Sequence, residues 1–489
     1  MNDVAIVGGG LAGMTAALRL LERGCRVTLY DSGTRLGGKA GAYTDVTGYN
    51  DHAYHIFPMW YLNVWKLVEE LGIGDNFVDC TEYWHLEAGQ FPHFKVLRNM
   101  ASVKSLPQNL FSGVLPVPEM FLFFYSLLDL ITQRYSERSL LDQISATGFI
   151  RSRFYRTEQL AEQYQDMMLK GISVPSYFVS TMTMRQVMRY WLRYSAPMFR
   201  IPRGNLQQFW IDPIEERLRQ LGCKIVLGHQ LERIEVSGDT VKELNFVNEA
   251  SEKIGVPVEK AIVAVPCECL EQVLDDRVYR SAPDLFRIQG LNVRPMASLN
   301  LYLRRKVPGI PKHHVDLVNS RFSLSFIDIS QFWTGYDTTV LNLIASDFET
   351  LAPLSPDEAV QQLVADLCQF FPQITADDIQ QFYFQSHVQQ PLFMNDVGAW
   401  QFRLDARTQL KNLFVAGDHC RSHVDLVSME GAVTTGLLAA EALRKDAGIE
   451  PAVEILIPKT YPAILMLLGK WALLPAAGLA KLTALVLGR

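Results

Sequence analysis

The sequence predicts an α/β protein whose parallel sheet is assembled from distant parts of the chain. Two observations indicate this class: a strand–turn–helix–strand pattern over the first 31 residues, and an apolar strand that ends in a Gly-Asp pair at residues 417–418. The length of 489 residues exceeds that of one compact domain, which usually has roughly 100–200 residues. We therefore expect two or three interleaved domains.

The composition is that of a globular protein with a large core. Hydrophobic residues make up 48% of the chain and charged residues 20%, which excludes a disordered or low-complexity polymer. The net charge is −6 and no tract of five or more basic residues occurs, so nucleic acid is not an expected partner. The mean hydropathy of +0.05 is slightly apolar for an enzyme.

The first strand of the predicted sheet is the apolar run Val4–Val7. It leads into a G-x-G-x-x-G turn and an Ala- and Leu-rich helix, which is the order of a Rossmann-type dinucleotide-binding fold. Asp3 precedes this run and no small-residue cleavage site frames it, so we expect no signal peptide. Since the glycines admit a pyrophosphate and the helix start offers free N–H groups, we expect cofactor contacts from Gly8, Gly10, Leu11, Ala12 and Gly13.

A second predicted strand, Arg26–Tyr30, ends at Asp31, whose carboxylate can accept hydrogen bonds from a ribose diol. The segment after it, Arg-Leu-Gly-Gly-Lys at 35–39, resembles the second glycine motif of FAD-binding oxidoreductases. In those enzymes the arginine neutralises phosphate and the glycines let the backbone approach the cofactor. The resemblance implies that FAD is bound, with contacts from Asp31, Ser32, Arg35, Gly37, Gly38 and Lys39.

The strand and Gly-Asp pair at 412–418 are followed ten residues later by Ser-Met-Glu-Gly-Ala-Val at 428–433. Together they resemble the closing FAD motif of a superfamily that includes amine oxidases, plant-type phytoene and zeta-carotene desaturases, and hydroxysqualene-processing flavoenzymes. There the acid binds the ribityl-pyrophosphate region, and a helix N-terminus stabilises negative charge at the flavin pyrimidine edge. The resemblance implies contacts from Gly417, Asp418, Met429, Glu430 and Ala432.

Segments between these motifs also resemble the superfamily and imply how the chain divides. Ile201–Leu206 resembles the segment that re-enters the FAD domain, and Lys260–Pro266 the strand that completes its nucleotide half. Further implied cofactor contacts are His55, Ile56, Leu231 and Val265. We expect a discontinuous FAD-binding domain at 1–80, 200–275 and 395–450, an inserted α+β substrate-binding domain at 81–199 and 276–394, and an apolar tail at 451–489.

Two residues of the closing motif favour the desaturase branch. Many amine oxidases place a tyrosine of an aromatic cage where this chain has Ser428, and Val427 precedes it. The run Tyr-His-Ile-Phe at 54–57 also resembles the plant-type desaturases. The resemblance implies hydride transfer to flavin N5 from an isoprenoid or carotenoid-like lipid, as in carotenoid biosynthesis. A flavin amine oxidase, and a flavin-dependent isomerase or binding protein without net redox, are the alternatives.

No second G-x-G-x-x-G occurs, so the sequence contains no visible NADPH site, and the electron acceptor is expected to be a quinone or oxygen. Histidines cluster at two places, His52 with His55 and His419 with His423. They could serve acid–base chemistry, orient an acceptor, or simply bond the cofactor or backbone; no metal site is expected. The candidate catalytic residues are His55, Arg185 and Arg421.

The apolar excess is concentrated in the last segment of the chain. Residues 455–489 contain no Asp or Glu, and Lys459, Lys470 and Lys481 recur every eleven residues, which puts them on one helical face. A helix with one basic face lies typically in a membrane interface, so we expect peripheral attachment to the cytoplasmic side of a membrane. A helix that packs on the protein, and a true span, are the alternatives. The aromatic run 121–128 could wall a tunnel, contact lipid or form a core helix.

Overall fold

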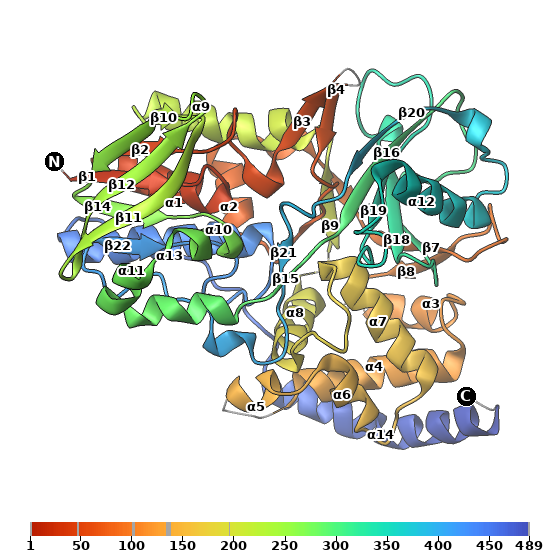
Figure 1. Cartoon of the computed structure of the whole chain (residues 1–489). Helices are drawn as coiled ribbons and strands as arrows, with labels where there is room; N and C mark the ends of the chain where they lie inside the picture. Colours follow the sequence, from red (N-terminus) through yellow and green to blue (C-terminus); the bar gives the residue numbers. More distant parts are fainter. Residues whose placement is uncertain (1, 46–47, 100–102, 134–137, 195, 488–489) are drawn as a thin grey trace.

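A five-stranded parallel sheet forms one end of the molecule in the computed structural model, which describes residues 2–45, 48–99, 103–133, 138–194 and 196–487 (Figure 1). Every neighbouring pair of strands in this sheet is parallel. Three separate stretches of chain contribute, as the sequence predicts. The strand order is β10 (Lys224–Val226), β2 (Arg26–Tyr30), β1 (Asp3–Val7), β14 (Lys260–Val263) and β22 (Leu413–Val415).

Two helices, α1 (Leu11–Leu21) and α13 (Met429–Ala447), pack closely against each other beside this sheet. Their approach depends on glycine, because a Cβ built on Gly436 would lie 2.3 Å from the carbonyl oxygen of Ala12. An antiparallel sheet adjoins the parallel one and shares a core with β1 and β14. Its strands are β11 (His229–Ser237), β12 (Thr240–Asn248) and β13 (Lys253–Pro257), and α9 (Asp212–Gln220), α10 (Cys267–Val273) and α11 (Asp276–Ser281) lie around the two sheets.

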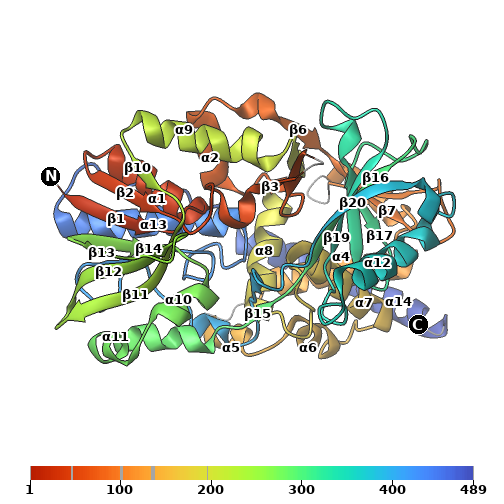
Figure 2. The same cartoon turned by 45° about the horizontal axis from the view of Figure 1, so that its top comes forward.

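A seven-stranded mixed sheet forms the opposite end of the molecule (Figures 1 and 2). Only its β17–β7 pair is parallel. The helix α12 (Pro356–Phe370) covers one face through a shared apolar core. The strand order is β20 (Ile379–Gln385), β16 (Ala297–Leu303), β19 (Val340–Ala345), β18 (Leu324–Asp328), β17 (Val315–Leu317), β7 (Glu82–Leu86) and β8 (Lys95–Arg98).

Short strands and one helix connect the two large sheets. They are the hairpin β3 (Ala42–Asp45) and β4 (Gly48–Asp51), the sheet of β5 (Phe57–Pro58), β9 (Phe199–Pro202) and β6 (Phe77–Cys80), the pair β15 (Val293–Arg294) and β21 (Leu392–Phe393), and α2 (Leu62–Glu70). The chain crosses between the sheets several times, so residues from both surround the space where they meet.

A layer of helices lies beneath the seven-stranded sheet in Figure 1. The aromatic run 121–128 falls in α4, most of whose residues are buried, so it forms a core helix. The helices of this layer are α3 (Leu106–Leu110), α4 (Val117–Ile131), α5 (Arg138–Asp142), α6 (Ala146–Arg151), α7 (Glu158–Ile172), α8 (Thr181–Arg193) and α14 (Ala463–Val486).

The apolar tail is helical only from Ala463 to Val486, as one continuous helix, α14, which passes through Pro475 and packs along α4. Of the three lysines predicted to share a helical face, Lys459 lies before the helix, whereas Lys470 and Lys481 share a face that is turned toward the protein. Lys470 forms an ion pair of 2.6 Å with Asp129 of α4, and Lys481 donates to the carbonyl oxygen of Arg156. By length and composition α14 could cross a bilayer, and only 6% of its most apolar window is buried.

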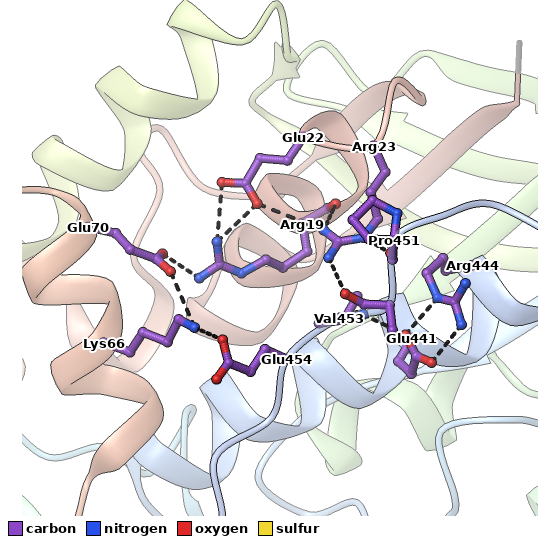
Figure 3. Close-up of polar contacts among 11 residues, drawn as sticks. Arg19, Glu22, Arg23, Lys66, Glu70, Glu441, Arg444, Pro451, Val453 and Glu454 are labelled. Atoms are coloured by element: carbon purple, nitrogen blue, oxygen red, sulfur yellow. Dashed lines mark hydrogen bonds and ion pairs between the residues drawn. The ribbon is translucent and has the colours of Figure 1, made fainter.

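Residues 448–462 form an extended strap that joins α13 to α14, and a polar network fixes it to the parallel-sheet end (Figure 3). Arg23 donates at 2.7 Å to the carbonyl oxygens of Pro451 and Ala452. The carboxylate of Glu441 accepts a bond of 2.8 Å from the backbone N–H of Val453. The strap therefore anchors α14 to the helices of the first sheet.

Candidate active site

The first glycine turn leaves an open cradle at the N-terminus of α1. Gly10 is the N-cap and offers no side-chain cap, and no acidic residue lies in the first turn. A Cβ built on Gly10 would meet nothing within 4 Å among the described residues. Because free N–H groups at a helix start attract anions, Leu11, Ala12 and Gly13 can bind a pyrophosphate here.

The turn itself requires glycine at two positions. Gly8 has a φ of +104°, and a Cβ there would lie 2.4 Å from the carbonyl oxygen of Ala264. A Cβ on Gly13 would lie 1.9 Å from the carbonyl oxygen of Gly8. The strand β14 therefore ends against the turn, which places Val265 beside it.

The second glycine segment lies directly on the first. The N–H of Gly37, which has a φ of +125°, donates to the carbonyl oxygen of Gly9 at 2.9 Å. A Cβ on Gly38 would lie 3.3 Å from the Cα atom of Gly10. The two motifs thus form one backbone-lined surface, although Gly37 lies 24 positions after Gly13, the last glycine of the first motif.

Asp31 braces both turns at the end of β2. One carboxylate oxygen accepts a bond of 2.6 Å from the N–H of Gly9, and the other accepts a bond of 2.7 Å from Gly33. Ser32 lies exposed beside it. The carboxylate is therefore next to the cradle, where the expected ribose contact stays a prediction.

The two basic residues of the second motif have different partners. Arg35 donates to the carbonyl oxygen of Ala42 at 2.8 Å. The ammonium of Lys39 lies 3.3 Å from the carboxylate of Glu268 in α10. Burial raises the pKa of Asp418, and Lys39 opposes that shift. Lys39 and Asp418, from opposite ends of the sequence, therefore lie near each other.

A buried arginine that the sequence does not indicate holds the loop after β22. Arg403, only 1% exposed, donates to the carbonyl oxygens of Asp418 at 2.8 Å and His419 at 3.1 Å. Its guanidinium also pairs with Asp425 at 2.5 Å. Breaking such a buried pair costs about 3–5 kcal/mol, so Arg403 fixes the loop that carries Asp418. No local pattern distinguishes this arginine in the sequence.

Burial lowers the pKa values of three of the predicted histidines, His52, His55 and His419, which favours their neutral forms. It lowers the pKa of His419 to about 3, and neither ring nitrogen has a hydrogen-bond partner in the described part of the chain. His55 contacts the carbonyl oxygen of Ala53 through Nδ1 at 2.7 Å, and burial lowers its pKa. His52 stacks on His387, with ring centroids 3.6 Å apart. Among described residues, no group of three or more His, Cys, Asp or Glu could hold a metal ion.

The two candidate catalytic arginines lie on different elements. Arg185 lies in α8 and is 8% exposed. Arg421 donates to the carbonyl oxygens of Trp400 at 3.2 Å and Gln401 at 3.1 Å. It lines an open cavity of about 570 Å³, together with Met182, Gln186, Trp400, Asp405, Ser422 and His423. Its bonds position the loop, and a catalytic role for either arginine stays a prediction.

The side chain of Glu430 is bound by the start of another helix, and its predicted cofactor contact stays a prediction. Its carboxylate accepts bonds from the backbone N–H groups of Asn63 at 3.0 Å and Val64 at 2.9 Å, at the N-terminus of α2. Asn63 in turn bonds the strap at Leu456, at 2.8–2.9 Å. The Glu430 side chain therefore joins α13 to α2 and the strap, and any cofactor contact at this position would come from its backbone.

Replacing Glu430 with glutamine should remove a pH dependence of stability. Burial raises the pKa of this carboxyl from its ordinary 4.5 to about 7, so the folded protein binds the proton more tightly than the unfolded chain does. The stabilisation is full below about pH 4.5 and is lost as the pH rises through about 7. We expect wild type to lose roughly 3 kcal/mol relative to the variant over this range, as measured by urea unfolding.

Glu441→Gln is the matched control on the same helix. A hydrogen bond from Arg444 lowers the pKa of Glu441, so its contribution is lost only as the pH falls below the ordinary value. Its stability difference from wild type should stay constant from about pH 5 upward. If the free energy of unfolding varied with pH in the same way in wild type and in the Glu430 variant, the raised pKa of Glu430 would be contradicted.

The remaining predicted contacts divide between the cradle and the core. Met429 and Ala432 lie in the first turn of α13, whose N-cap Ser428 accepts a bond of 3.0 Å from Gly431. Gly417, with a φ of +146°, lies two residues after the end of β22. Ile56 is partly buried and Leu231 is buried in β11. Met429, Ala432 and Gly417 can face a cofactor near the start of α13, whereas Leu231 contributes to the core of its sheet.

Residues of this site fit FAD. The α1 cradle with its two stacked glycine segments suits a pyrophosphate, Asp31 lies where a ribose would follow, and the start of α13 offers a second positive helix end. The fold brings Lys39 and Asp418 near each other, and Asp418 lies at the start of α13, where its Cβ is 3.5 Å from a Cβ built on Gly431.

Comparisons with known proteins agree with this fit. The chain is 24% identical to a 15-cis-phytoene desaturase of Synechococcus elongatus, over 90% of this chain and 95% of that protein. It is 23% identical to a zeta-carotene desaturase of Synechocystis, over 92% and 99%. Its fold resembles that of an oxidoreductase from Methanosarcina mazei, with a TM-score of 0.68 and 14% identity over 91% of this chain and 100% of that one. It also resembles that of cyclohexylamine oxidase from Brevibacterium oxydans, with a TM-score of 0.65 and 17% identity over 91% of this chain and 99% of that one.

The sequence pattern described as "Flavin containing amine oxidoreductase" matches residues 11–444. This match extends from the first residue of α1 nearly to the end of α13, and so includes both helix starts of the site. The chain is therefore an FAD-dependent oxidoreductase that belongs to the family of flavin-containing amine oxidoreductases.

Proposed function

We propose that this protein dehydrogenates a hydrophobic, isoprenoid- or carotenoid-like substrate that it takes from a membrane surface. The relatives named as phytoene and zeta-carotene desaturases match about nine-tenths of the chain, which supports this substrate class. Ser428 supports it as well, because its side chain caps α13 where many amine oxidases have a cage tyrosine.

The observation that carries the proposal is the outward face of α14. At 100° per residue, Ile464, Leu468, Trp471, Leu479 and Leu482 lie on one side, each 61–67% exposed. Lys470 and Lys481 lie on the opposite side, against the protein. A contiguous apolar face of this kind is typical of a surface that meets lipid. We infer peripheral attachment to the cytoplasmic side of a membrane.

The chain's own residues would bind, orient and shield the reactants. Bound FAD supplies the redox chemistry by accepting a hydride from the substrate. The start of α1 and the two glycine segments would hold the pyrophosphate, and Arg403 would keep Asp418 in place. The start of α13 would favour negative charge on the flavin edge. We propose residues 81–199 and 276–394 as the substrate-binding part, and a quinone or oxygen as electron acceptor.

Anaerobic mixing of the holoenzyme with candidate substrates tests this function. We expect the visible flavin absorbance to bleach with polyprenyl or carotenoid lipids and to persist with putrescine or cyclohexylamine. Bleaching by the amines alone would establish an amine oxidase instead. Conversion of a lipid while the flavin stays oxidised would indicate an isomerase. Purification of the protein without bound flavin would refute its assignment as a flavin-dependent enzyme.

A further inference from the structure

The seven-stranded sheet has one apolar face and one face on which polar and apolar residues are mixed. Successive residues of a strand point to opposite faces, and one set packs with α12 in an apolar core that includes Leu299, Leu301, Leu324, Phe326, Leu341 and Leu343. The alternate positions on the other face carry apolar residues of a second core, Ile327, Val340 and Ile344, and a set of polar residues: Ser298, Asn300, Tyr302, Ser325, Asn342, Asp316 and His85. An apolar ligand binds best against apolar side chains, so the polar side chains on this face require an explanation.

Strand register brings the polar side chains into two groups on either side of β18, whose Ile327 lies opposite Asn342 and whose Ser325 lies opposite Asp316. Asn300 of β16 lies directly opposite Asn342 of β19. Asp316 of β17 lies opposite His85 of β7, and His314 falls on the same face as Asp316, two residues earlier. The imidazoles of His85 and His314 lie 3.7 Å and 3.8 Å from the carboxylate oxygens of Asp316. We call Asn300, Asn342, His314, Asp316 and His85 the polar strip.

Each residue of the polar strip is buried and has a polar atom without a hydrogen-bond partner among the described residues. Asn342 is fully buried, and both atoms of its amide lack a partner. The others are 3–8% exposed. Their atoms without a partner are Oδ1 of Asn300, Nε2 of His85, Nδ1 of His314 and Oδ1 of Asp316. Folded proteins seldom leave such atoms unpaired, so a water or a ligand group is needed here.

The polar strip lies next to the candidate active site. Asn300 donates to the side-chain oxygen of Asn50 at 2.7 Å, and Ser298 of the same face donates to the carbonyl oxygen of His52 at 2.7 Å. The Tyr54 hydroxyl meets that of Ser325 at 2.7 Å. The segment from Asn50 to Tyr54 therefore crosses the polar face and runs directly into His55. A substrate that reaches the flavin region would have this face within reach.

The charges around the polar strip favour a neutral ligand group. The buried ammonium of Lys170 donates to Asp166 at 2.7 Å and to the carbonyl oxygen of Leu317 at 3.0 Å. It also lies near enough to Asp316 to lower the pKa of that carboxyl against the effect of burial. Lys170 thus faces two carboxylates, and because burial raises the pKa of Asp166, its charge remains available to offset that of Asp316 and to oppose a second cation. Since the strip has both acceptors and donors, a hydroxyl group, which is both, suits it.

We propose that the polar strip binds a hydroxyl group at one end of an otherwise apolar substrate. This inference rests on the proposed oxidation of an isoprenoid-like lipid and narrows its substrate to one that carries an oxygen. The hydroxyl donates to the Asp316 carboxylate or an Asn342 oxygen and accepts from an imidazole or amide N–H. The apolar remainder then extends from the strip past the Asn50–Tyr54 segment toward the flavin.

Binding of three matched probes to the holoenzyme tests the proposal. The probes are geranylgeraniol, the hydrocarbon in which a methyl replaces its CH2OH group, and geranylgeranylamine. Their dissociation constants are measured by tryptophan fluorescence and by perturbation of the flavin spectrum. In wild type we expect the alcohol to bind at least about tenfold more tightly than the hydrocarbon. In Asn342→Leu this ratio should fall several-fold, with hydrocarbon binding unchanged or stronger.

Stability and a same-face control distinguish this effect from damage to the fold. Asn342→Leu removes two unpaired buried atoms at similar volume, so its thermal unfolding midpoint should equal or exceed that of wild type. Ser298→Ala lies on the same face, but its hydroxyl is already bonded to His52, so it should leave the alcohol-to-hydrocarbon ratio unchanged.

Equal binding of alcohol and hydrocarbon by wild type would overturn the proposal, because the strip would then hold water only. Tighter binding of the amine than of the alcohol would also overturn it. If the hydrocarbon reduced the flavin and the alcohol bound no more tightly, the proposed function would stand, but the polar strip would not be a hydroxyl-binding site. A clear preference for the alcohol without flavin reduction by any lipid would retain the strip and reject the function.

Discussion

Gly10→Ala should purify without flavin while its apoprotein remains as stable as the wild-type apoprotein. The backbone at Gly10 has φ −75° and ψ 179°, which any residue adopts, and a Cβ there meets nothing within 4 Å among the described residues. The fold therefore tolerates alanine, with a change of less than about 1 kcal/mol. The methyl group instead occupies the space through which a pyrophosphate approaches the start of α1. We expect FAD affinity to fall at least about a hundredfold, as measured by titration of the apoprotein.

Two other glycines bracket this result. Gly13→Ala places its Cβ 1.9 Å from the carbonyl oxygen of Gly8, so it should lose both the flavin and several degrees of thermal stability. Gly74→Ala lies in open space in a short turn between α2 and β6, so it should bind FAD normally. Normal flavin content in Gly10→Ala would show that the cradle at α1 is not the pyrophosphate site.

The parallel sheet could be predicted from the sequence because its signals are local. Strands such as Val4–Val7 are short apolar runs bounded by glycine, and the closing helix begins at Met429, where the sequence places it. Backbone geometry at Gly8, Gly13 and Gly37 then accounts for the glycine spacing in physical terms. Each of these features depends on residues only a few positions apart in the chain, so it can be predicted from the local sequence.

Contacts between distant segments could not be predicted in this way. Arg403 holds a loop that begins 15 residues later, and His387 stacks on a histidine 335 residues away. Neither residue belongs to a recognisable motif, because its partners are chosen by tertiary packing. The bonds of the Glu430 carboxylate to the start of α2 are a third case, because the closing motif contains Glu430 but its partners Asn63 and Val64 lie more than 360 residues earlier.

For the lysines of α14, the spacing correctly predicts a shared helical face, but it does not predict that this face contacts the protein. Their eleven-residue spacing does place Lys470 and Lys481 on one face, but that face meets Asp129 and the Arg156 carbonyl. A hydrophobic period alone does not state which face is covered by protein. The small residues Ala477, Ala480 and Ala484, all buried, mark the covered side and could have indicated it, since small side chains permit close helix packing.

A triple variant of α14, Leu468→Gln, Trp471→Gln and Leu482→Gln, should release the protein from lipid vesicles. The three side chains are 61–67% exposed and lie on the face opposite the lysines. Each would transfer part of its apolar surface into the acyl region, so their loss should weaken partitioning by about 3 kcal/mol in total, roughly a hundredfold. Co-sedimentation with phosphatidylcholine vesicles measures this shift, and flavin content should not change, because the site is anchored elsewhere.

Lys470→Gln is the matched control, since it removes a charge from the covered face of the same helix. It should lower the free energy of unfolding, because Asp129 loses a 2.6 Å ion-pair partner in a buried setting. Vesicle binding should nevertheless remain within about twofold of wild type, with little dependence on anionic lipid, because attachment through the outward face is apolar. Binding that requires anionic lipid and is lost in Lys470→Gln would refute the apolar attachment. A triple variant that stays bound to vesicles, but differs from wild type in oligomeric state by light scattering, would assign the outward face of α14 to contact with a second copy of the chain.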